Sequence, residues 1–372
     1  MTTPKTKYLS YPIKRDVVFV LGAGASHPDG VPLQRHILPM ILSSEEINDS
    51  EIGRIVVQFI RDNFAYNSEQ RIYPLLESVF GFIDYFIQQN ESLSSNYTID
   101  KIRLIKEYLI KIIHYIVNLK THKENSIYKY FWESVQSYNP NVSIITLNYD
   151  TLLEQAFDSQ FIKFGYLDYC FHLMNYEKRD ELKPFNFWIN PREPVPTEEN
   201  ESPHSIKILK LHGSLNWKYC NCCNQTLLTP WDREIDLNRG KLTGYTYPDK
   251  QKYDYYCPLD NTEFETLIMP PLFAKHLNQP VISQLLSEAS REIRSAKKII
   301  FVGYSLSNAD VHIHALFKKQ LKNNVKIEVI NTRNLETLKL KYRSLSADVN
   351  FHNFSFEDMV KNKNFMQSLL NE

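Results

Sequence analysis

The sequence lacks the features of a membrane, secreted or nucleic-acid-binding protein. It contains no run of about eighteen apolar residues, the least that a membrane-spanning helix needs. Its first residues, MTTPKTKYLSYPIKRD, hold no apolar stretch of the kind found in a secretory signal. Lys and Arg together number 43, as do Asp and Glu, and no block of like charge occurs. We therefore expect a cytoplasmic protein without direct nucleic-acid binding, unless the fold itself gathers a basic patch.

Cysteine and glycine are also scarce. The 372 residues include 5 cysteines and 10 glycines. An odd number of cysteines argues against a disulfide framework, and four of the five lie between Cys220 and Cys257. This clustering favours a metal site. Because glycine is rare, each glycine within a motif is more informative.

Six short β-branched or aromatic runs are predicted strands. They are residues 17–21, 142–146, 206–211, 298–302, 326–330 and 348–352. Several are apolar almost throughout, as in strands that are covered on both faces. Helical stretches separate most of them, which favours a parallel sheet. The predicted fold class is α/β, a Rossmann-like parallel sheet of about six strands with a helical insert and a small zinc-ribbon-like module.

Three intervals are predicted to lie outside the sheet. One of them, 155–205, ends in PREPVPTEENESPH, whose proline and acidic residues predict an exposed loop. Residues 36–140 contain no convincing strand, and alternating spacings of three and four place six apolar residues on one helical stripe. They are Ile102, Ile105, Leu109, Ile112, Ile116 and Leu119. We interpret the interval as a helical insert that packs on the core, with an oligomer seam as the alternative. Residues 215–270, which hold most of the cysteines, are the predicted small module.

Glycine-containing and polar motifs follow five of the predicted strands. They are 22–26 (GAGAS), 146–150 (TLNYD), 212–214 (HGS), 303–306 (GYSL) and 330–331 (IN). Ligand sites in open parallel sheets form at the carboxyl ends of the strands. The sequence therefore predicts one site that is assembled from five loops.

The loop at 22–26 directly follows the first of these strands. Gly22 and Gly24 permit a sharp turn that exposes backbone N–H groups to an anionic pyrophosphate, with Ala23 between them and Ser26 as a hydroxyl donor. The third glycine of the Rossmann fingerprint is replaced by His27. A tight strand–helix turn without a ligand is the alternative.

Asn148 and Asp150 flank Tyr149 after the strand at 142–146. Residues two apart on an extended segment face the same side, so both polar side chains are expected in one pocket with Tyr149 packed behind. An Asx cap on the following helix is the alternative for Asp150. Such a cap explains Asn148 less well, so we favour a functional pair.

His212 is the candidate proton acceptor. The glycine after it lets a ligand approach closely, and imidazole titrates near neutrality, although a structural histidine is the alternative. Gly303, Ser305 and Asn331 follow later strands and are predicted to bind the ribose hydroxyls of a dinucleotide, a role that capping would mimic in sequence.

Asp310 is predicted to cap the helix that begins VHIHALFKKQ. His312 and His314 lie two apart on this helix, so their side chains are expected to point in different directions and to make a poor metal pair.

Cys220 and Cys223 have the spacing of the first ligand pair in a structural zinc ribbon. The second pair should also be Cys-x-x-Cys, but Asp260 follows Cys257 at that spacing. Asp260 would supply an oxygen ligand, or Cys222 would substitute with distortion. The alternative is a module that has lost its metal. Zinc, if bound, would be structural.

The ordered motifs resemble those of the sirtuin family, and more closely its divergent NAD-hydrolase branch in bacterial anti-phage defence. The family's GAGxS is present at 22–26, GIPDFR appears as GVPLQR at 30–35, NID as NYD at 148–150, HG at 212–213, GTS as GYS at 303–305, and the adenosine-side Asn as Asn331. The resemblance covers roughly 16–35, 142–156, 206–270 and 298–358 and excludes the insert. The order of the motifs makes it specific.

The resemblance implies one sirtuin-like domain over 1–372 with NAD as its substrate. Asp150 would hold the nicotinamide carboxamide, Asn148 would position the ribose or a water near the anomeric carbon, and His212 would accept a proton. Nicotinamide leaves as a neutral molecule, so no strong general acid is needed. The barrier lies in an oxocarbenium-like transition state that aligned polar groups stabilise.

Three departures from the family favour NAD hydrolysis over protein-lysine deacylation. Deacylases carry Gln where this chain has Leu147, their DFR becomes LQR at 33–35, and their zinc module looks degraded here. Each departure weakens deacylation and leaves cleavage of the glycosidic bond, with water as acceptor. A non-catalytic sensor of NAD or ADP-ribose is a further alternative, although a sensor needs neither Asn148 nor His212 for chemistry.

The defence branch also implies a biological setting. It implies NAD depletion on infection, a homo-oligomer and a separately encoded ATPase partner, since the chain has no Walker sequence of its own. The helical insert at 36–140 is the predicted place for such contacts.

Overall fold

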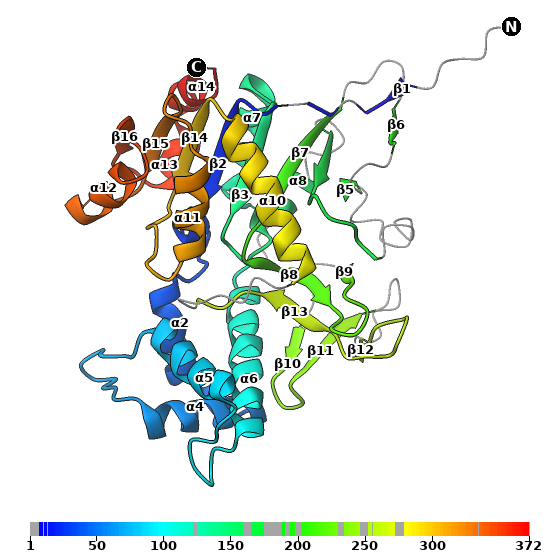
Figure 1. Cartoon of the computed structure of the whole chain (residues 1–372), viewed down its shortest axis with the longest axis vertical. Coiled ribbons are helices and arrows are strands. Elements are labelled where there is room, and N and C mark those ends of the chain that lie inside the picture. Colours follow the sequence, from blue (N-terminus) through cyan, green and yellow to red (C-terminus); the bar gives the residue numbers. More distant parts are fainter. Residues whose placement is uncertain are drawn as a thin grey trace, which may run out of the picture.

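Figure 1 shows the computed structural model of the chain, in which a large sheet with its helices lies above a helical lobe and a group of small strands. The structure describes residues 7–9, 11–12, 14–121, 125–158, 165–174, 188–189, 194–197, 203–229, 234–245, 252–254, 256–271, 279–333 and 335–371.

The large sheet has eight strands in the order β16-β15-β14-β2-β3-β7-β4-β5, and every neighbouring pair is parallel. They are β2 (Val17–Leu21), β3 (Val142–Thr146), β4 (Gly165–Asp168), β5 (Trp188–Ile189), β7 (His204–Lys210), β14 (Lys298–Val302), β15 (Lys326–Ile330) and β16 (Val349–His352). The predicted fold class is confirmed. Strands β4 and β5 lie within 155–205, so the prediction that this interval lies outside the sheet is wrong for these residues. Their sequences, GYLD and WI, hold no β-branched run of the kind that marked the other strands.

The carboxyl ends of five strands form one row across this sheet. Leu21 of β2 pairs in register with Thr146 of β3 on one side and Val302 of β14 on the other. Val302 also pairs with Ile330 of β15, and Thr146 also pairs with Lys210 of β7. Each of these residues is the last of its strand. The five predicted motifs therefore begin side by side at one edge of the sheet.

Helices cover both faces of the sheet. From β2 the chain moves across the sheet through β3 to β4 and β5 before it returns to β7, and from β14 it moves in the opposite direction through β15 to β16. Right-handed crossovers therefore place the helices of these two halves on opposite faces. In Figure 1, α10 and α11 lie in front of the sheet. The helices packed around the sheet are α1 (Ala23–Ser26), α7 (Tyr128–Tyr138), α8 (Leu152–Asp158), α10 (Pro280–Ser295), α11 (Val311–Gln320), α12 (Glu336–Arg343), α13 (Phe356–Lys361) and α14 (Lys363–Asn371), with the 3-10 turn η1 (His27–Asp29).

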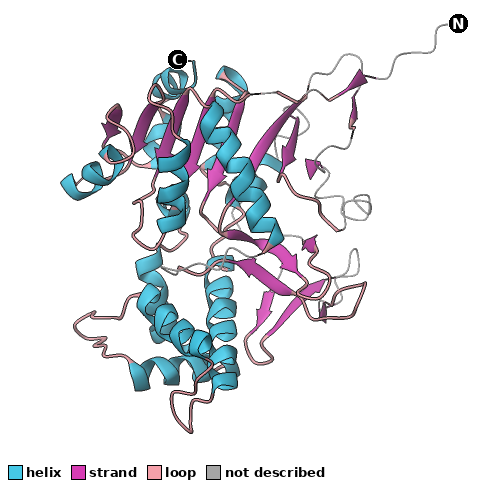
Figure 2. Cartoon of the chain, in the orientation of Figure 1, coloured by secondary structure: helices cyan, strands magenta, loops and turns pink. Residues whose placement is uncertain are grey.

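The interval 36–140 is mainly helical. Its helices are α2 (Gln34–Ser43), α3 (Glu45–Asp49), α4 (Glu51–Asn63), α5 (Leu76–Gln89), α6 (Ile99–Asn118) and α7. Figure 2 shows α2–α6 as a helical lobe, whereas α7 returns to the sheet and packs on α8 and α14. Five of the six predicted stripe residues are buried in the chain's own core. Leu119 is 57% exposed, because α6 ends one residue before it.

The small strands form two further sheets. One has the order β13-β8-β9 and the other β10-β11-β12, and all their pairs are antiparallel. They are β8 (Gly213–Tyr219), β9 (Thr226–Leu228), β10 (Glu234–Asp236), β11 (Lys241–Tyr245), β12 (Lys252–Asp254) and β13 (Glu265–Ile268), and a separate pair joins β1 (Lys7–Tyr8) to β6 (Pro196–Thr197). Gly213 has φ +81° and a side chain there would strike the Leu267 carbonyl, so glycine lets the chain leave β7 and enter β8.

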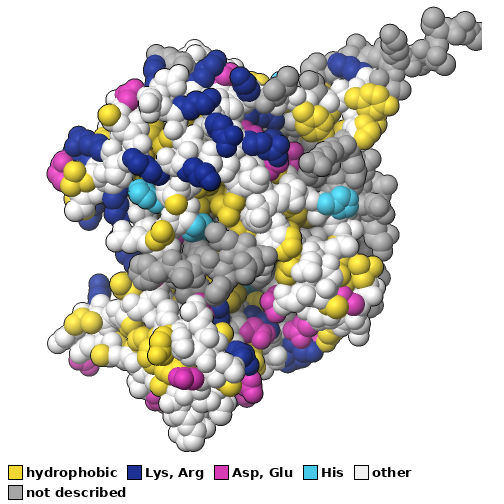
Figure 3. Space-filling view, viewed as in Figure 1, with side chains coloured by type: hydrophobic (Ala, Val, Ile, Leu, Met, Phe, Trp, Pro, Cys, Tyr) yellow, Lys and Arg dark blue, Asp and Glu magenta, His cyan; other side chains and the backbone are white. Residues whose placement is uncertain are grey.

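Charge is distributed unevenly on one face of the molecule (Figure 3), although the net charge is zero. On the face shown in Figure 3, Lys and Arg spread over the half that holds the sheet and its helices, and Asp and Glu lie mostly over the other half. Within the described residues, no helix has both the length and the apolar character that a membrane crossing requires.

Glycine allows two of the strand-end loops to meet backbone to backbone. A Cβ on Gly24 would lie 2.7 Å from the Cα of Gly303, and one on Gly22 would lie 2.6 Å from the Cα of Tyr304. Gly303 also has a left-handed φ of +58°. The Gly22 amide donates to the Val302 carbonyl at 3.0 Å, and the Gly24 amide to the Gly303 carbonyl at 2.9 Å. These contacts join the loops after β2 and β14.

We expect Gly24→Ala to lower the free energy of unfolding by about 1–3 kcal/mol, because the added methyl group would press on backbone atoms that cannot move aside cheaply. Gly81→Ala is the matched control. Gly81 lies in α5, and a methyl group added there would meet no atom within 4 Å, so the same change should raise stability by about 0.5–1 kcal/mol. Urea unfolding of both variants measures the difference, and equal effects at the two sites would contradict the close-packing role.

Candidate functional site

A cavity of about 1300 Å³ lies at the carboxyl ends of the strands. All five predicted loops contribute to its lining. Nine of the predicted ligand-contacting residues line it, namely Gly22, Ala23, Gly24, Asn148, Asp150, His212, Gly303, Ser305 and Asn331. Ser26 is the exception, because its side chain is fully buried behind the loop. The structure thus brings together residues that are up to about three hundred positions apart in the sequence.

The helical lobe supplies a wall of this cavity that the sequence did not predict. Arg71, Tyr73 and Leu75 line it from the segment before α5, and Ile113 and Val117 line it from α6. The motif-based interpretation placed the site only at the strand ends, since these five residues form no recognisable motif. The lobe and the sheet therefore share one cavity.

The glycine loop is built differently from the phosphate cradle expected from the sequence. The amide of Gly22 donates to the last residue of β14, and the amide of Gly24 donates to Gly303 in the loop after it. The amide of Ala25 donates to the Gly22 carbonyl at 2.9 Å. These N–H groups are therefore used within the protein. Gly22 and Gly24 line the cavity, but their lack of a side chain serves the close contact with Gly303.

Asn148 is held in a single orientation by its amide group. Its Nδ2 donates to the Gly22 carbonyl and to Ser26 Oγ, both at 3.0 Å. A carbonyl oxygen can only accept, so Nδ2 and not Oδ1 must face Gly22. With both amide protons engaged, the acceptor Oδ1 is the atom that Asn148 offers to a ligand hydroxyl or water in the cavity.

Ser26 and Tyr128 support Asn148 from behind. The hydroxyl oxygens of Ser26 and Tyr128 lie 2.9 Å apart, and Ser26 also hydrogen-bonds Asp150. Ser26 thus links Asn148 with Asp150. Tyr128 is completely buried on α7, and burial together with the nearby Asp150 charge raises its pKa well above the usual value. No sequence motif pointed to Tyr128, because its partners lie more than a hundred residues earlier or on another loop.

Asp150 combines a capping role with a place in the cavity. Its Oδ1 accepts a hydrogen bond from the amide of Leu152 at 3.2 Å, at the start of α8, as the capping alternative expects. Burial raises the pKa of Asp150, although the Lys210 charge and the Ser26 hydroxyl act in the opposite direction. A ligand N–H donor would stabilise the ionised carboxylate further.

A buried ion pair fixes the backbone around Asp150. Lys210 Nζ lies 2.8 Å from Glu154 Oε1 and donates to the Asp150 carbonyl at 2.5 Å. Both side chains are 1% exposed or less. A buried charge is costly unless it is paired and hydrogen-bonded, so this contact ties the end of β7 to the loop after β3.

Tyr149 differs from its predicted position. It lines the cavity instead of packing behind it, and its hydroxyl donates to the Met269 carbonyl at 2.6 Å. The alternation expected of an extended segment fails here because β3 ends at Thr146. Tyr149 therefore joins the loop after β3 to the segment after β13.

His212 faces the carboxylate of Asp310, which was predicted to cap the helix α11. His212 Nε2 lies 3.4 Å from Asp310 Oδ1, and both side chains are at most 10% exposed. Asp310 occupies the N-cap position of α11 but makes no side-chain cap hydrogen bond. Instead its Oδ2 accepts from the Tyr304 hydroxyl at 3.0 Å. Burial and the Asp310 charge raise the pKa of Tyr304, which keeps that hydroxyl protonated and able to donate.

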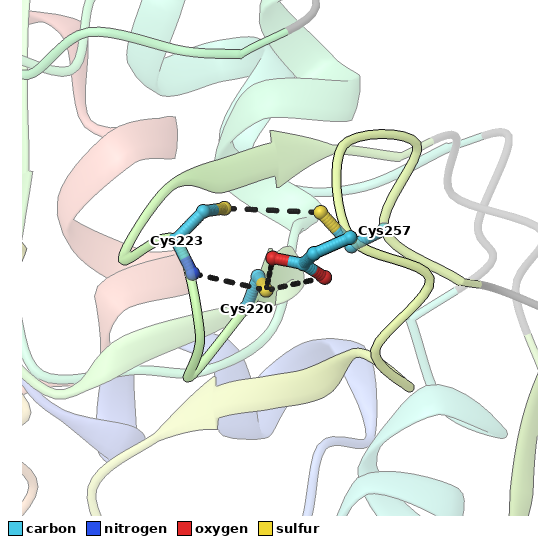
Figure 4. A group of neighbouring side chains, drawn as sticks. Cys220, Cys223 and Cys257 are labelled. Atoms are coloured by element: carbon cyan, nitrogen blue, oxygen red, sulfur yellow. Dashed lines mark hydrogen bonds between the residues drawn. The ribbon is translucent and has the colours of Figure 1, made fainter.

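The four predicted metal ligands come together in the small module. Donor atoms of Cys220, Cys223, Cys257 and Asp260 all lie within 4.8 Å of one another. Figure 4 shows the three cysteines turned toward one centre. Cys222, the alternative ligand, is exposed and outside this group, although it hydrogen-bonds Asp260.

The spacing of these donors fits a tetrahedral zinc ion. Cys223 Sγ lies 3.7 Å from Cys257 Sγ, and two sulfurs at the usual Zn–S distance in a tetrahedron are about 3.8 Å apart. Cys220 Sγ lies 3.3 Å and 3.5 Å from the Asp260 oxygens, close to the about 3.6 Å of a tetrahedral sulfur–oxygen edge. With four protein ligands the ion would be closed to substrate and structural.

We expect the purified chain to bind zinc through these residues, more tightly as the pH rises. Burial raises the pKa of the Cys257 thiol to about 11, so a metal must displace protons in order to bind. Cys223→Ser should lose the zinc and have a lower melting temperature than the parent chain. The matched Cys222→Ser should keep both the zinc and the melting temperature of the parent chain. Metal content and thermal unfolding measure this, and equal zinc in the two variants would refute the ligand set.

A protein-family model described as SIR2-like domain matches residues 142–329, just over half of the chain. The match includes Asn148, His212 and Gly303, while the glycine loop at 22–26 and Asn331 lie outside it. No curated protein is significantly similar in sequence to this chain.

Several solved sirtuin structures are similar to the chain at low identity. One, from work on sirtuin substrate affinity, is 15% identical over 94% of this chain and 93% of that chain, with a TM-score of 0.41. A Sir2 homologue in complex with NAD is 13% identical over 98% and 96%, with a TM-score of 0.43. A Sir2 complex with a p53 peptide and NAD+ is 13% identical over 94% and 92%, with a TM-score of 0.41. By its match to the family model, this chain belongs to the SIR2-like family.

Proposed function

We propose that the chain is an NAD+ glycohydrolase, which converts NAD+ and water to nicotinamide, ADP-ribose and a proton. The observation that supports this most directly is the single orientation of Asn148 in the same cavity as His212. Membership of the SIR2-like family and the five ordered motifs support NAD+ as the substrate.

The proposed reaction needs one bond broken and one formed. The bond between the anomeric carbon and the nicotinamide nitrogen breaks, and its electron pair neutralises the pyridinium. A water oxygen then bonds to the anomeric carbon and its proton passes to His212. Asn148 Oδ1, the acceptor end of a fixed amide, accepts a hydrogen bond from the ribose or the attacking water. Fixed dipoles of this kind stabilise developing charge without reorganising during the reaction.

Asp150 is assigned to the leaving group. Its buried carboxyl gains an N–H donor when a carboxamide binds, which offsets the desolvation that raises its pKa. The Lys210–Glu154 pair holds the Asp150 backbone and so sets where this carboxyl lies. Gly303, Ser305 and Asn331 line the cavity at the strands farther along the row and are assigned to the remainder of the dinucleotide.

Water is the proposed acceptor because the chain departs from the deacylase pattern. Leu147 is buried at the position where deacylases carry Gln. The segment at 33–35 lines the cavity with Leu, Gln and Arg, so it brings no carboxylate. NAD-dependent deacylation is therefore ranked second.

We expect Asn148→Ala to lower NAD+ turnover by about 10²–10³-fold, the usual effect of removing one group that stabilises the transition state. His212→Gln should lower it by about 10²–10⁴-fold, the usual contribution of a general base. Chromatography of nicotinamide and ADP-ribose measures both. The matched control is Asn350→Ala on β16, an exposed asparagine whose amide donates to Glu328 of β15.

An acetylated-lysine peptide added to the same assay separates hydrolase from deacylase. Hydrolysis predicts ADP-ribose as the sugar product and an unchanged peptide. Deacylation predicts an acetylated ADP-ribose and a peptide whose lysine has lost its acetyl group. Saturable NAD+ binding without any product would instead indicate a sensor. Full turnover in both the Asn148 and His212 variants would reject the proposed active site.

We further propose, from the resemblance to the anti-phage branch, that the chain depletes NAD+ during infection as a homo-oligomer with an ATPase partner. We expect bacteria that carry the chain with its partner to lose NAD+ after phage infection, and cells with Asn148→Ala to retain it. Cellular NAD+ measured over the infection tests this. Equal NAD+ levels in the two strains would contradict the defence role while leaving the activity in vitro untouched.

A further inference from the structure

His212 and Asp310 meet a second histidine beside the cavity. The ligand atoms of His212, Asp310 and His312 all lie within 4.8 Å of one another, and the rings of the two histidines are 5.4 Å apart. The sequence analysis considered His312 together with His314 and predicted a poor metal pair, because residues two apart on a helix point in different directions. The fold instead brings His312 to a histidine from the junction of β7 and β8.

We propose that His212, Asp310 and His312 form a binding site for a divalent transition-metal ion such as Zn²⁺, and that the bound ion inhibits the enzyme. Two imidazoles and one carboxylate are ligands that zinc and its neighbours prefer, whereas magnesium and calcium prefer oxygen alone. The site is separate from the cysteine cluster.

The geometry favours a bridging cation over a simple hydrogen-bonded pair. The 3.4 Å between His212 Nε2 and Asp310 Oδ1 is longer than a usual N–H···O hydrogen bond. It equals the about 3.4 Å that separates a nitrogen and an oxygen bound to one tetrahedral zinc ion. The Tyr304 hydroxyl, which donates to the other Asp310 oxygen, orients the carboxylate as second ligand shells commonly do.

The surroundings of the site are compatible with a cation. Asp310 is the N-cap residue of α11 and His312 lies in its first turn, where the helix dipole opposes a cation with roughly half a positive charge. The full negative charge of Asp310 outweighs it. His212 and Asp310 line the cavity, so an ion can enter from solution, and three protein ligands leave one position for water.

A bound ion would disable His212 whichever nitrogen it used. A neutral imidazole has one nitrogen with a free lone pair, and the other nitrogen carries a proton. A metal that takes the lone pair leaves His212 unable to accept a proton from water. This inhibitory part of the inference rests on the proposed function, whereas the binding part does not.

Zinc binding to the full chain provides the test. After dialysis against Zn²⁺, the parent chain should hold one equivalent more than His312→Gln, in addition to any zinc on the cysteines. His314→Gln is the matched control, since His314 lies on the same helix but contacts Ser344 and should bind as the parent does. Equal zinc in the parent and His312→Gln would overturn the proposed site, whether or not the chain hydrolyses NAD+.

The turnover assay tests inhibition separately. Zn²⁺ should abolish NAD+ hydrolysis by the parent and by His314→Gln, and His312→Gln should keep its activity in Zn²⁺ because His312 does not line the cavity. Zinc that binds through His312 while leaving turnover unchanged or raised would overturn the inhibitory role. A parent without NAD+ turnover would refute the proposed function alone, and the zinc content would still decide the site.

Discussion

The in-register pairing of five parallel strands is the constraint on which the rest of this structure depends. Leu21, Thr146, Val302, Ile330 and Lys210 form one row, so the loop after each strand starts at the same edge. Neighbouring strands are about 4.8 Å apart, and the row is therefore about 19 Å long. A row of this length suits an elongated ligand that contacts several loops. The hydrogen bonds between the strands set this register. The starting points of the five loops are therefore fixed by the sheet and not by contacts among the loops.

The loops themselves are joined by contacts that leave no room for side chains. The Gly22 amide donates to Val302 and the Gly24 amide to Gly303, and a methyl group on Gly22, Gly24 or Gly303 would strike the opposite segment. This packing couples the first strand of the sheet with a strand almost three hundred residues later. It also gives the glycines a different role from the predicted one. Their amides were expected to bind phosphate, but they hold the two segments together.

The polar groups of the site are oriented by burial. Ser26 and Tyr128 lie where water cannot satisfy them, so each must find a partner inside the protein. Ser26 and the Gly22 carbonyl then fix the amide of Asn148 in one orientation. The Lys210–Glu154 pair acts in the same way on the Asp150 backbone. The site is therefore preorganised. The atoms that it presents to a ligand are those that are not already engaged in hydrogen bonds within the protein.

Local sequence patterns were enough to predict the parallel sheet and the strand-end motifs, because apolar runs and glycine turns depend on near neighbours. The ranges of β2, β3, β14 and β15 match the predicted strands, and all five motifs line one cavity. Tertiary structure alone decided that Ser26 turns away from the cavity, that Tyr128 supports Asn148 and that Asp310 faces His212 instead of capping its helix. These contacts join residues distant in the chain, and no local periodicity encodes which buried polar groups will meet.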